Sequence, residues 1–285
     1  MPEGDTIYRT ARTLSKALGG KSITAFRSTY PNLTRVHDDT PLTGQHVASV
    51  ESRGKWLLIH FSGGATLATH MLMNGSWHIY RHGERWQRPR TDMRIVIENS
   101  DYIAVGFKVP VAEMHTAQSL ARHTKIPAVE RDVLSGAFDV AGVKARMLAR
   151  GNEAIADVLL RQDVLAGVGN EFKSEICFLV GIHPYCKVSE LSQEQMEAVI
   201  VAAQKLLKLN VLWDSGDTLL TYGGRHRRTT SASDPEDRVW VYGRAGEPCR
   251  RCGELIRRRM QGPDARVTFW CARCQPLPDG SEIDG

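Results

Sequence analysis

The chain has 285 residues, of which 42% are hydrophobic and 24% charged, ordinary values for one large globular domain or two to three smaller ones. No run of about 18 apolar residues occurs, which excludes a membrane-spanning helix, and the polar residues 1–5 lack the apolar core of a secretory signal. The net charge of +5 is modest and excludes no class of partner. We expect a soluble intracellular protein.

The first periodic segment predicts an amphipathic helix. Asp5 or Thr6 can cap it, and apolar residues recur at intervals of three and four up to a Gly19-Gly20 stop. From there to about residue 116 the pattern changes to short segments separated by turn residues. Such spacing is typical of an antiparallel β-sandwich. We expect strands at residues 23–27, 45–52, 56–61, 66–71, 76–81, 93–98 and 102–107.

The second half of the chain is predicted to be helical, after a segment with weak signals that we interpret as a linker. In the most informative stretch a helix ends near Gln162, Gly167 and Gly169 supply permissive backbone, and Asn170 caps a new helix. A glycine-rich turn that opens a helix is an anion site, although an ordinary helical hairpin has the same pattern. Other helices are expected at residues 142–150, 153–160 and 193–209, the last with an apolar stripe attributed to packing.

Four of the six cysteines form two C-x-x-C pairs, Cys249 with Cys252 and Cys271 with Cys274. Two such knuckles can complete a tetrahedral four-sulfur shell around Zn²⁺. Two disulfides are the alternative, but a cytosolic protein keeps its thiols reduced. The four ligands leave no open position, so the predicted zinc is structural. Of the other two cysteines, Cys177 is interpreted as a small buried hydrophobe, and neither is expected to bind metal.

Arginine is concentrated around these cysteines: residues 222–274 contain twelve Arg and no Lys against six Asp and Glu. A solvated basic surface is the alternative, but beside a zinc site the guanidinium groups favour nucleic-acid binding. Alternation of polar and apolar residues from Arg266 to Trp270 predicts a strand leading into the second cysteine pair. A zinc-capped hairpin with Arg266 near its tip could place a guanidinium on a phosphate.

Three motifs occur in one order: Pro2-Glu3-Gly4, Val168-Gly169-Asn170 between helices, and the four-cysteine finger with Arg266 before Phe269-Trp270-Cys271. Together with residues 53–58 and 69–76, they resemble the bacterial formamidopyrimidine-DNA glycosylase and endonuclease VIII family from Pro2 to Cys274. The resemblance implies an α+β multidomain fold with an N-terminal helix and antiparallel β-sandwich. Its parts would be a catalytic sandwich domain (1–116), a linker (117–135), a helix–two-turns–helix DNA-binding domain (136–222), a zinc finger (240–275) and a disordered tail (276–285).

The resemblance also implies a nucleophile at the N-terminus. Removal of Met1 would expose the secondary amine of Pro2, and an α-amine has a pKa near ~8, so part of it is neutral in the cell. The neutral amine can attack C1′ of a damaged nucleoside, expel the base and leave an iminium. Glu3 would assist ring opening and proton transfer. By themselves these residues would be unremarkable, since many chains begin with Met-Pro.

Further roles are implied by the same resemblance. Lys55 and Arg266 would assist elimination and, with His70 and Asn170, hold phosphates beside the lesion. Met73 would fill the space left by the flipped base. Without the resemblance, Lys55 would be interpreted as a solvated lysine on a strand, His70 as a satisfied sheet histidine and Met73 as a core methionine.

Two departures from the family pattern concern the reaction and the substrate. Thr6 stands where the family has a carboxylate, and residues 104–107 lack the Arg-Arg-Phe-Gly run of the oxidised-guanine branch. The second departure favours endonuclease VIII, and the start of the chain is similar to an actinobacterial subgroup. We expect a DNA glycosylase and AP lyase that removes oxidised pyrimidines with β,δ-elimination. An oxidised-purine glycosylase and a non-catalytic binder of damaged DNA are the alternatives.

The remaining expectations concern partners and location. Damaged DNA is the expected partner, with no membrane contact, and the protein is expected to act as a monomer carrying one structural Zn²⁺. Its expected location is the cytoplasm, in association with the bacterial nucleoid.

Overall fold

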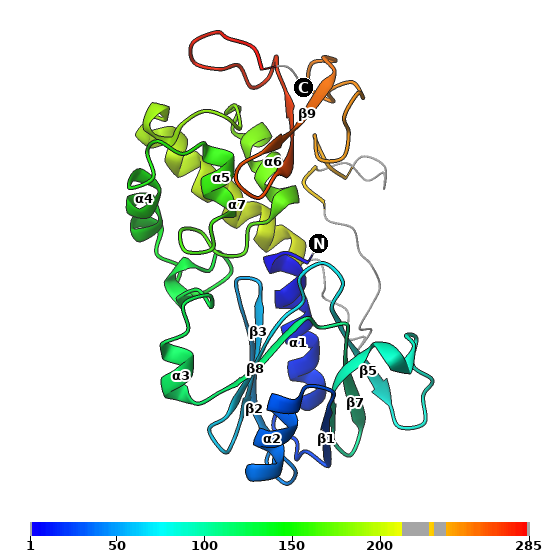
Figure 1. The fold of residues 1–285 in the computed structure, drawn as a ribbon. Coiled ribbons are helices and arrows are strands. Elements are labelled where there is room, and N and C mark those ends of the chain that lie inside the picture. Colours follow the sequence, from blue (N-terminus) through cyan, green and yellow to red (C-terminus); the bar gives the residue numbers. More distant parts are fainter. Residues whose placement is uncertain (1, 213–227, 231–237, 284–285) are drawn as a thin grey trace. The chain divides into compact units, whose positions relative to one another are not determined.

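A computed structural model describes residues 2–212, 228–230 and 238–283 of the chain (Figure 1). The chain divides into two compact units, and their boundary lies between Ile126 and Pro127, inside the segment interpreted as a linker. Within the described residues the first unit therefore comprises 2–126, and the second comprises the rest.

The first unit contains two four-stranded antiparallel sheets with strand orders β2-β3-β4-β8 and β1-β6-β7-β5. Four of the seven expected strands have the predicted bounds, and the bounds of the other three differ by one or two residues. Strand β8 and helix α2 were not expected. The elements are α1 (Gly4–Leu18), β1 (Ala25–Ser28), α2 (Pro31–Asp39), β2 (Val47–Arg53), β3 (Trp56–Phe61), β4 (Thr66–His70), β5 (Ser76–Arg81), β6 (Met93–Glu98), β7 (Tyr102–Phe107), β8 (Val111–His115) and α3 (Ala117–Ala121).

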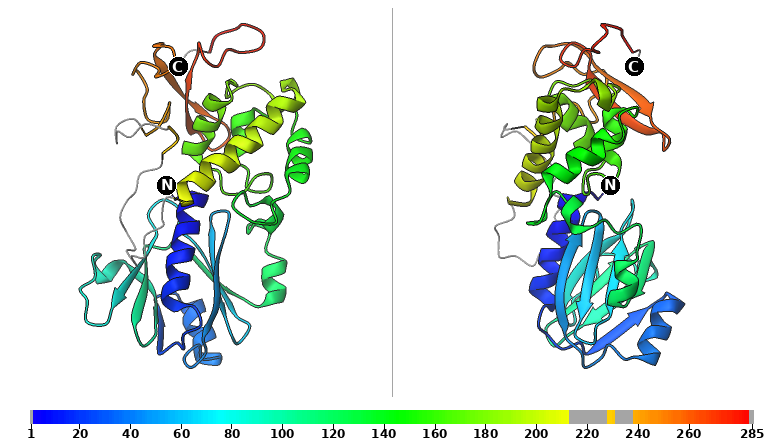
Figure 2. Two further views of the ribbon diagram at one scale, coloured as in Figure 1. Left: turned by 180° about the vertical axis from the view of Figure 1, so that it is seen from behind. Right: turned by 90° about the vertical axis from the view of Figure 1, so that its left-hand side faces the viewer.

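Helix α1 packs against strands of both sheets (Figures 1 and 2). Its predicted apolar stripe is buried, with Ile7, Leu14 and Leu18 each 1% exposed. The predicted cap is wrong: the helix begins at Gly4 and its N-cap residue is Glu3, so Asp5 and Thr6 lie in the first turn. The stripe fixes the direction of α1 and so sets where the residues at its start lie.

Strand β3 buries side chains on both of its faces because other parts of the first unit pack against each face of the sheet. Leu57 and Ile59 point into the sandwich with the apolar side chains of α1. Trp56 and Leu58 point outward, where they form a second small core with Ala68 and Ile126. Successive strand residues alternate between faces, so the outer core requires helix α3 and the chain that follows it to lie on the sheet.

The second unit contains helices around one apolar core and a two-stranded hairpin that carries the finger. The stripe of α7, including Met196, Ile200 and Leu207, is buried in this core, which confirms its role in packing. Cys177 is buried there as predicted. The elements are α4 (Val140–Leu148), α5 (Ile155–Leu160), α6 (Asn170–Leu179), α7 (Gln193–Leu212), β9 (Ile256–Gln261) and β10 (Arg266–Cys271).

The predicted combination of an antiparallel sandwich, a helical region and a cysteine finger is thus confirmed. Within the described residues, no helix has both the length and the apolar character needed to cross a membrane. The last described residues, 276–283, contain neither helix nor strand, and Arg257 of β9 donates to the carboxylate of Glu282 at 3.0 Å. Disorder of the tail stays a prediction.

Candidate active site and zinc centre

The predicted nucleophile and acid lie at the start of helix α1. Pro2 is half-buried, and Glu3 is 1% exposed. The backbone carbonyl of Glu3 accepts hydrogen bonds from Thr6 and Ile7, at 3.0 and 3.1 Å. Glu3 therefore follows Pro2 directly in the chain and is the N-cap residue at the positive end of the helix dipole, which favours an anion. Thr6 lies in the first turn with its hydroxyl 3.4 Å from a carboxylate oxygen of Asp5.

Lys55 lies in a hairpin turn rather than on a strand, which corrects the expectation from the sequence. Arg53 and Trp56 are the closing pair of the β2–β3 hairpin, so Gly54 and Lys55 form its two-residue loop. Gly54 has φ +59°, the left-handed backbone that tight hairpin loops require at their first position. The turn therefore presents the Lys55 ammonium group at the end of a rigid two-stranded element.

His70 is the last residue of β4 and the cross-strand partner of Trp56. Its Nδ1 accepts the backbone N–H of Leu72 at 3.1 Å, so a neutral ring carries its proton on Nε2. Burial, with the nearby charge of Lys55 as a second cause, lowers the pKa of His70 to about 4. At neutral pH His70 is thus an uncharged donor through Nε2–H, close to a lysine. Sequence reasoning had not distinguished this donor from a charged one.

The turn after His70 holds two apolar side chains in solvent. Leu72 and Met73 are 45% and 60% exposed, and Leu72 has φ +45°, a conformation that is costly for a side chain of this size. Gly75 permits the turn, because a Cβ there would lie 2.7 Å from the carbonyl oxygen of Met71. Met73 is therefore exposed as a wedge would be and is not a core methionine. Leu72 shares this exposure and was missed, although the apolar run 71–73 before Asn74-Gly75 was a signal.

Asn170 is the first residue of α6, and its N-cap residue is Gly169, so the prediction that Asn170 is the cap is wrong. The loop before it is held by Gln162, whose side chain accepts from Gly167 N and donates to the Val168 carbonyl, both at 3.0 Å. Gly167 has φ +104°, as expected for permissive backbone. The Asn170 side chain is thereby fixed at a helix N-terminus.

Asn170 of α6 contacts β10, the strand that begins at Arg266. The Asn170 amide nitrogen donates to the carbonyl of Val267, the residue after Arg266, at 2.9 Å. Its Oδ1 is buried and has no hydrogen-bond partner among the described residues. Arg266 begins β10 directly after the turn, opposite Gln261, so the predicted hairpin with an arginine near its tip is confirmed.

Lys173 is a further residue near Arg266, and sequence reasoning missed it. It lies one helical turn after Asn170, is 0% exposed, and donates to the hydroxyl of Thr268 at 2.7 Å. A buried ammonium group is costly unless it is paired and hydrogen-bonded. The lysine therefore fixes the position of β10 on α6.

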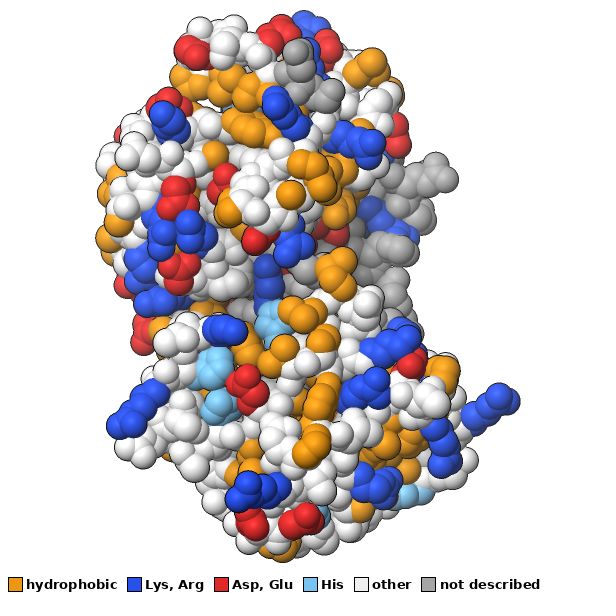
Figure 3. Space-filling model, in the orientation of Figure 1, with side chains coloured by type: hydrophobic (Ala, Val, Ile, Leu, Met, Phe, Trp, Pro, Cys, Tyr) orange, Lys and Arg blue, Asp and Glu red, His pale blue; other side chains and the backbone are white. Residues whose placement is uncertain are grey.

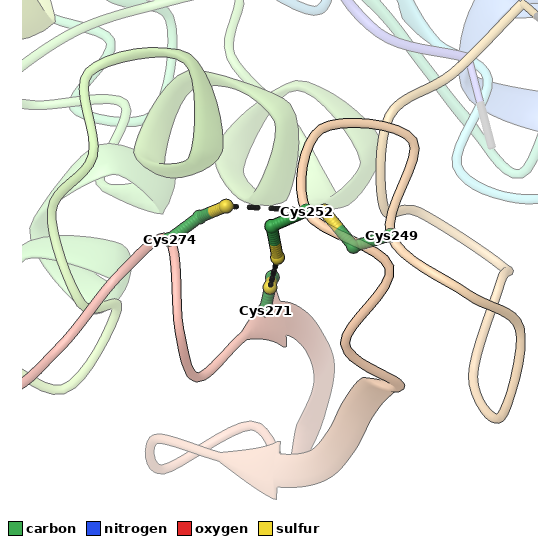
Figure 4. Close-up of side chains that lie close together, drawn as sticks. All are labelled: Cys249, Cys252, Cys271 and Cys274. Atoms are coloured by element: carbon green, nitrogen blue, oxygen red, sulfur yellow. Dashed lines mark hydrogen bonds between the residues drawn. The ribbon is translucent and has the colours of Figure 1, made fainter.

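The four predicted metal ligands form one cluster. Their sulfur atoms lie within 4.8 Å of one another, with Cys252 and Cys271 at 3.4 Å and Cys249 and Cys274 at 3.9 Å (Figure 4). All six cysteines, which lie in the described part of the chain, are free thiols, so the disulfide alternative is wrong. Zn–S bonds of ~2.3 Å in a tetrahedron require sulfur atoms about 3.8 Å apart, so the four thiolates fit Zn²⁺.

The second cysteine knuckle is attached to the helical part of its unit by Gln275. The Gln275 side chain accepts from Cys271 N at 3.0 Å and donates to the Ile182 carbonyl at 2.9 Å. A cation held by the four thiolates would thus fix β10, and with it Arg266, to the helices.

Lys and Arg side chains on the face shown in Figure 3 lie among acidic and apolar ones, so on this face the positive charge is not gathered into one patch.

Three family models match successive parts of the chain. Residues 1–108 match the formamidopyrimidine-DNA glycosylase N-terminal domain, residues 129–220 match the formamidopyrimidine-DNA glycosylase H2TH domain, and residues 246–277 match a zinc finger found in FPG and IleRS. The second match confirms the predicted helix–two-turns–helix region, and the third matches the cysteine finger.

Curated relatives are similar over nearly their whole length. Probable endonuclease 8 2 of Streptomyces coelicolor is 35% identical over 98% of this chain and 95% of its own. DNA-(apurinic or apyrimidinic site) lyase Nei2 of Mycolicibacterium smegmatis is 36% identical over 96% of this chain and 99% of its own. Among solved structures, Lactococcus lactis Fpg in complex with abasic-site DNA superposes with a TM-score of 0.78 at 20% identity, over 96% of this chain and 99% of that one.

Proposed function

The chain belongs to the formamidopyrimidine-DNA glycosylase and endonuclease VIII family, and on this basis we propose that it is a base-excision repair enzyme that removes oxidised bases, pyrimidines in particular, and cleaves the resulting abasic site. The observation that carries the proposal is the burial of Glu3, the residue directly after Pro2, at the start of α1. Burial of an acidic side chain lowers the stability of a fold unless the group is paired. Such groups are concentrated at functional sites, and here the acid could transfer protons next to the proposed terminal amine.

The proposed reaction starts after removal of Met1. The Pro2 nitrogen forms a bond to C1′ while the bond from C1′ to the base breaks, and the base departs with a proton. Glu3 donates a proton to the sugar ring oxygen as the ring opens, and the amine proton is lost, which leaves an iminium. Loss of a C2′ proton then expels the 3′ phosphate, and a second elimination expels the 5′ phosphate. The product is a one-nucleotide gap.

The remaining predicted residues are proposed to hold the DNA. His70 would donate Nε2–H to a phosphate, and Lys55 would supply a neighbouring charge that also assists elimination. The second amide N–H of Asn170 and the Arg266 guanidinium would bind phosphates, as expected of a helix N-terminus and a planar fork. Met73 would occupy the space left by the flipped base.

Preference for oxidised pyrimidines is supported by strand β7. Residues 104–107 are buried, and a Cβ on Gly106 would lie 3.4 Å from the Trp77 indole and 3.2 Å from Val109. The sequence of this segment lacks the Arg-Arg-Phe-Gly run, whose arginine is implied by the family resemblance to face the orphaned cytosine. The alternative, an oxidised-purine glycosylase, predicts the opposite preference on the same oligonucleotides.

Borohydride trapping tests the proposed nucleophile. The enzyme should form a covalent adduct with DNA that contains an oxidised pyrimidine or an abasic site, and Pro2→Gly should abolish that adduct. A trapped adduct that survives in Pro2→Gly would overturn the assignment of Pro2. Cleavage of thymine-glycol and 8-oxoguanine duplexes measures the lesion preference, and abasic-site binding without cleavage would favour a non-catalytic binder.

We further propose that the protein carries one structural Zn²⁺, works as a monomer and acts in the cytoplasm at the nucleoid. The four-thiolate cluster supports the metal. Metal analysis of the purified protein and its sedimentation with and without DNA measure these properties.

A further inference from the structure

The outer face of the sheet β2-β3-β4-β8 carries a hydrogen-bonded cluster that the proposed reaction does not use. It consists of Glu113 and His115 of β8 and His123 from the chain after α3, whose side-chain ligand atoms lie within 4.8 Å of one another. We propose that Glu113 anchors a clamp, residues 123–126, through its hydrogen bond to His123, and that this clamp positions His70 for phosphate binding through Trp56. The inference rests on the proposed function. It identifies Trp56 and His123 as positioning residues for the proposed DNA contact of His70.

Trp56 connects the clamp to His70. Its indole packs edge-on against His70 and also against His123, with ring centroids 5.2 Å apart in each pair and interplanar angles of 78° and 73°. The indole Nε1–H donates to the carbonyl of Lys125 at 3.1 Å. Trp56 is 6% exposed, so these contacts determine where its ring lies, and the ring in turn supports His70.

His123 is itself fixed at both ring nitrogens. Nδ1 accepts the backbone N–H groups of Lys125 and Ile126 at 3.2 and 3.0 Å. A nitrogen that accepts carries no proton, so the neutral ring is protonated on Nε2, which lies 2.9 Å from a carboxylate oxygen of Glu113. The same oxygen lies 3.1 Å from Nε2 of His115. The clamp is therefore attached to β8 by a charge-assisted hydrogen bond.

The same tautomer argues against a metal site, although two imidazoles and a carboxylate are ligands that Zn²⁺ accepts. A histidine coordinates through a lone pair, and in metal sites its other nitrogen donates its proton. In His123 the Nδ1 lone pair already faces two N–H donors, and Nε2 holds the proton that faces Glu113. The cluster is thus an anchor rather than a metal centre.

Positioning matters for His70 because the ring is neutral at the pH of the cell. An uncharged donor has no long-range attraction for a phosphate, so its contribution depends on the direction of the Nε2–H bond. One side of that ring is fixed by the Leu72 N–H and the other by the edge of Trp56. Loss of the clamp would release the second constraint.

The test uses the full-length enzyme and a duplex with a stable tetrahydrofuran abasic analogue. His123→Ala should weaken binding by about five- to tenfold, since one hydrogen bond to a charged group is misdirected. Single-turnover cleavage at saturating abasic DNA should change by less than about twofold, because the clamp touches no reacting atom. Binding within twofold of wild type would overturn the inference.

His115→Ala is the matched control. His115 contacts the same Glu113 oxygen and lies on the same face, but its ring contacts His123 rather than Trp56. Its removal should change binding by less than about twofold. His123→Asn adds a second variant that retains an acceptor for the two backbone N–H groups and lacks the ring edge. It should bind as weakly as His123→Ala, and wild-type binding by His123→Asn would refute the ring contact.

A double-mutant cycle separates positioning from general stability. If His123 acts through His70, then adding His123→Ala to His70→Ala should cause no further loss of affinity, whereas independent effects would add. An additive result overturns the inference. Zinc analysis tests the argument from the His123 tautomer. A second equivalent of zinc that is present in the wild type and lost in His115→Ala would show that the cluster is a metal site and would overturn the inference. Failure of the wild type to cleave abasic DNA would instead refute the proposed function.

Discussion

The proposed DNA contacts of the first unit and those of the second are held in place by different means. Lys55, His70 and Met73 lie at turns of an antiparallel sheet, where cross-strand pairing and a neighbouring aromatic ring fix them. Asn170 and Arg266 lie where a helix meets a hairpin that is joined to the rest of its unit through a thiolate cluster. The first arrangement depends on packing within the sheet, and the second would depend in addition on the proposed cation at the four thiolates. Removal of the metal should therefore affect the two units unequally.

The largest expected effect is the loss of zinc in Cys252→Ser. Structural zinc sites contribute apparent free energies of about 10–16 kcal/mol, so the hairpin should lose its fixed packing around Trp270, which is 0% exposed. Loss of two charge-assisted phosphate contacts corresponds to about a hundredfold weaker DNA binding. Tryptophan fluorescence, zinc analysis and binding to an abasic-site duplex measure these changes. Cys186→Ser, which alters a buried cysteine outside the cluster, should retain zinc; equal zinc loss in both variants would contradict the assignment.

Glu3→Gln should affect the chemistry of the first unit while DNA binding persists. General acid–base catalysis contributes about 10²- to 10⁴-fold, and the amide cannot transfer the proton. Base release in a single turnover should therefore slow by at least about a hundredfold. Affinity for the tetrahydrofuran duplex serves as the internal control and should stay within about twofold. A rate within tenfold of wild type would assign proton transfer to another group.

Gly75→Ala tests the turn that exposes Met73. The added Cβ would lie 2.7 Å from the Met71 carbonyl oxygen and 2.9 Å from its Cα, backbone atoms that cannot move independently. The strain should lower the free energy of unfolding by roughly 1–3 kcal/mol, measured by urea denaturation. Gly136→Ala is the control, because no atom that the structure describes lies within 4 Å of its added Cβ. Equal stability of the two variants would show that the turn relaxes.

The sequence predicted elements where the local pattern contained enough information. Strands β3, β5, β6 and β7 have apolar or alternating runs between turn residues and were located at their bounds. Helix α2 has a single buried residue, Leu33, so its sequence lacks the repeat of apolar residues that would predict a helix. Strand β8 alternates with Glu113 and His115 on one face, whose partner His123 comes from outside the strand, and no local pattern reveals such a contact.

The same reasoning applies to the candidate site. The cysteine cluster follows from spacing alone, because each C-x-x-C pair is local and four thiolates have few other uses. The neutral state of His70 and the burial of Lys173 depend on tertiary contacts and could not be predicted. The position of Lys55 in a turn was within reach, since Arg53-Gly54-Lys55 separates two strand patterns and glycine favours tight hairpin loops.

The smallest expected effect concerns acid and compares one buried histidine from each unit. Burial lowers the pKa of both His78 and His183 to about 4, against ~6.5 in an unfolded chain. Because the unfolded state binds these protons first, each histidine contributes stability above pH ~6.5 that is progressively lost as the pH falls toward 4. Urea midpoints measured between pH 7.5 and 5 should therefore decrease, and less steeply in His78→Gln and in His183→Gln. His183 lies in the unit that also holds the thiolates, so the decisive comparison repeats these measurements after a chelator has removed the metal. His78→Gln should still make the urea midpoint of the first unit less dependent on pH. If chelation removes the effects of His78→Gln and His183→Gln equally, the two units do not unfold separately.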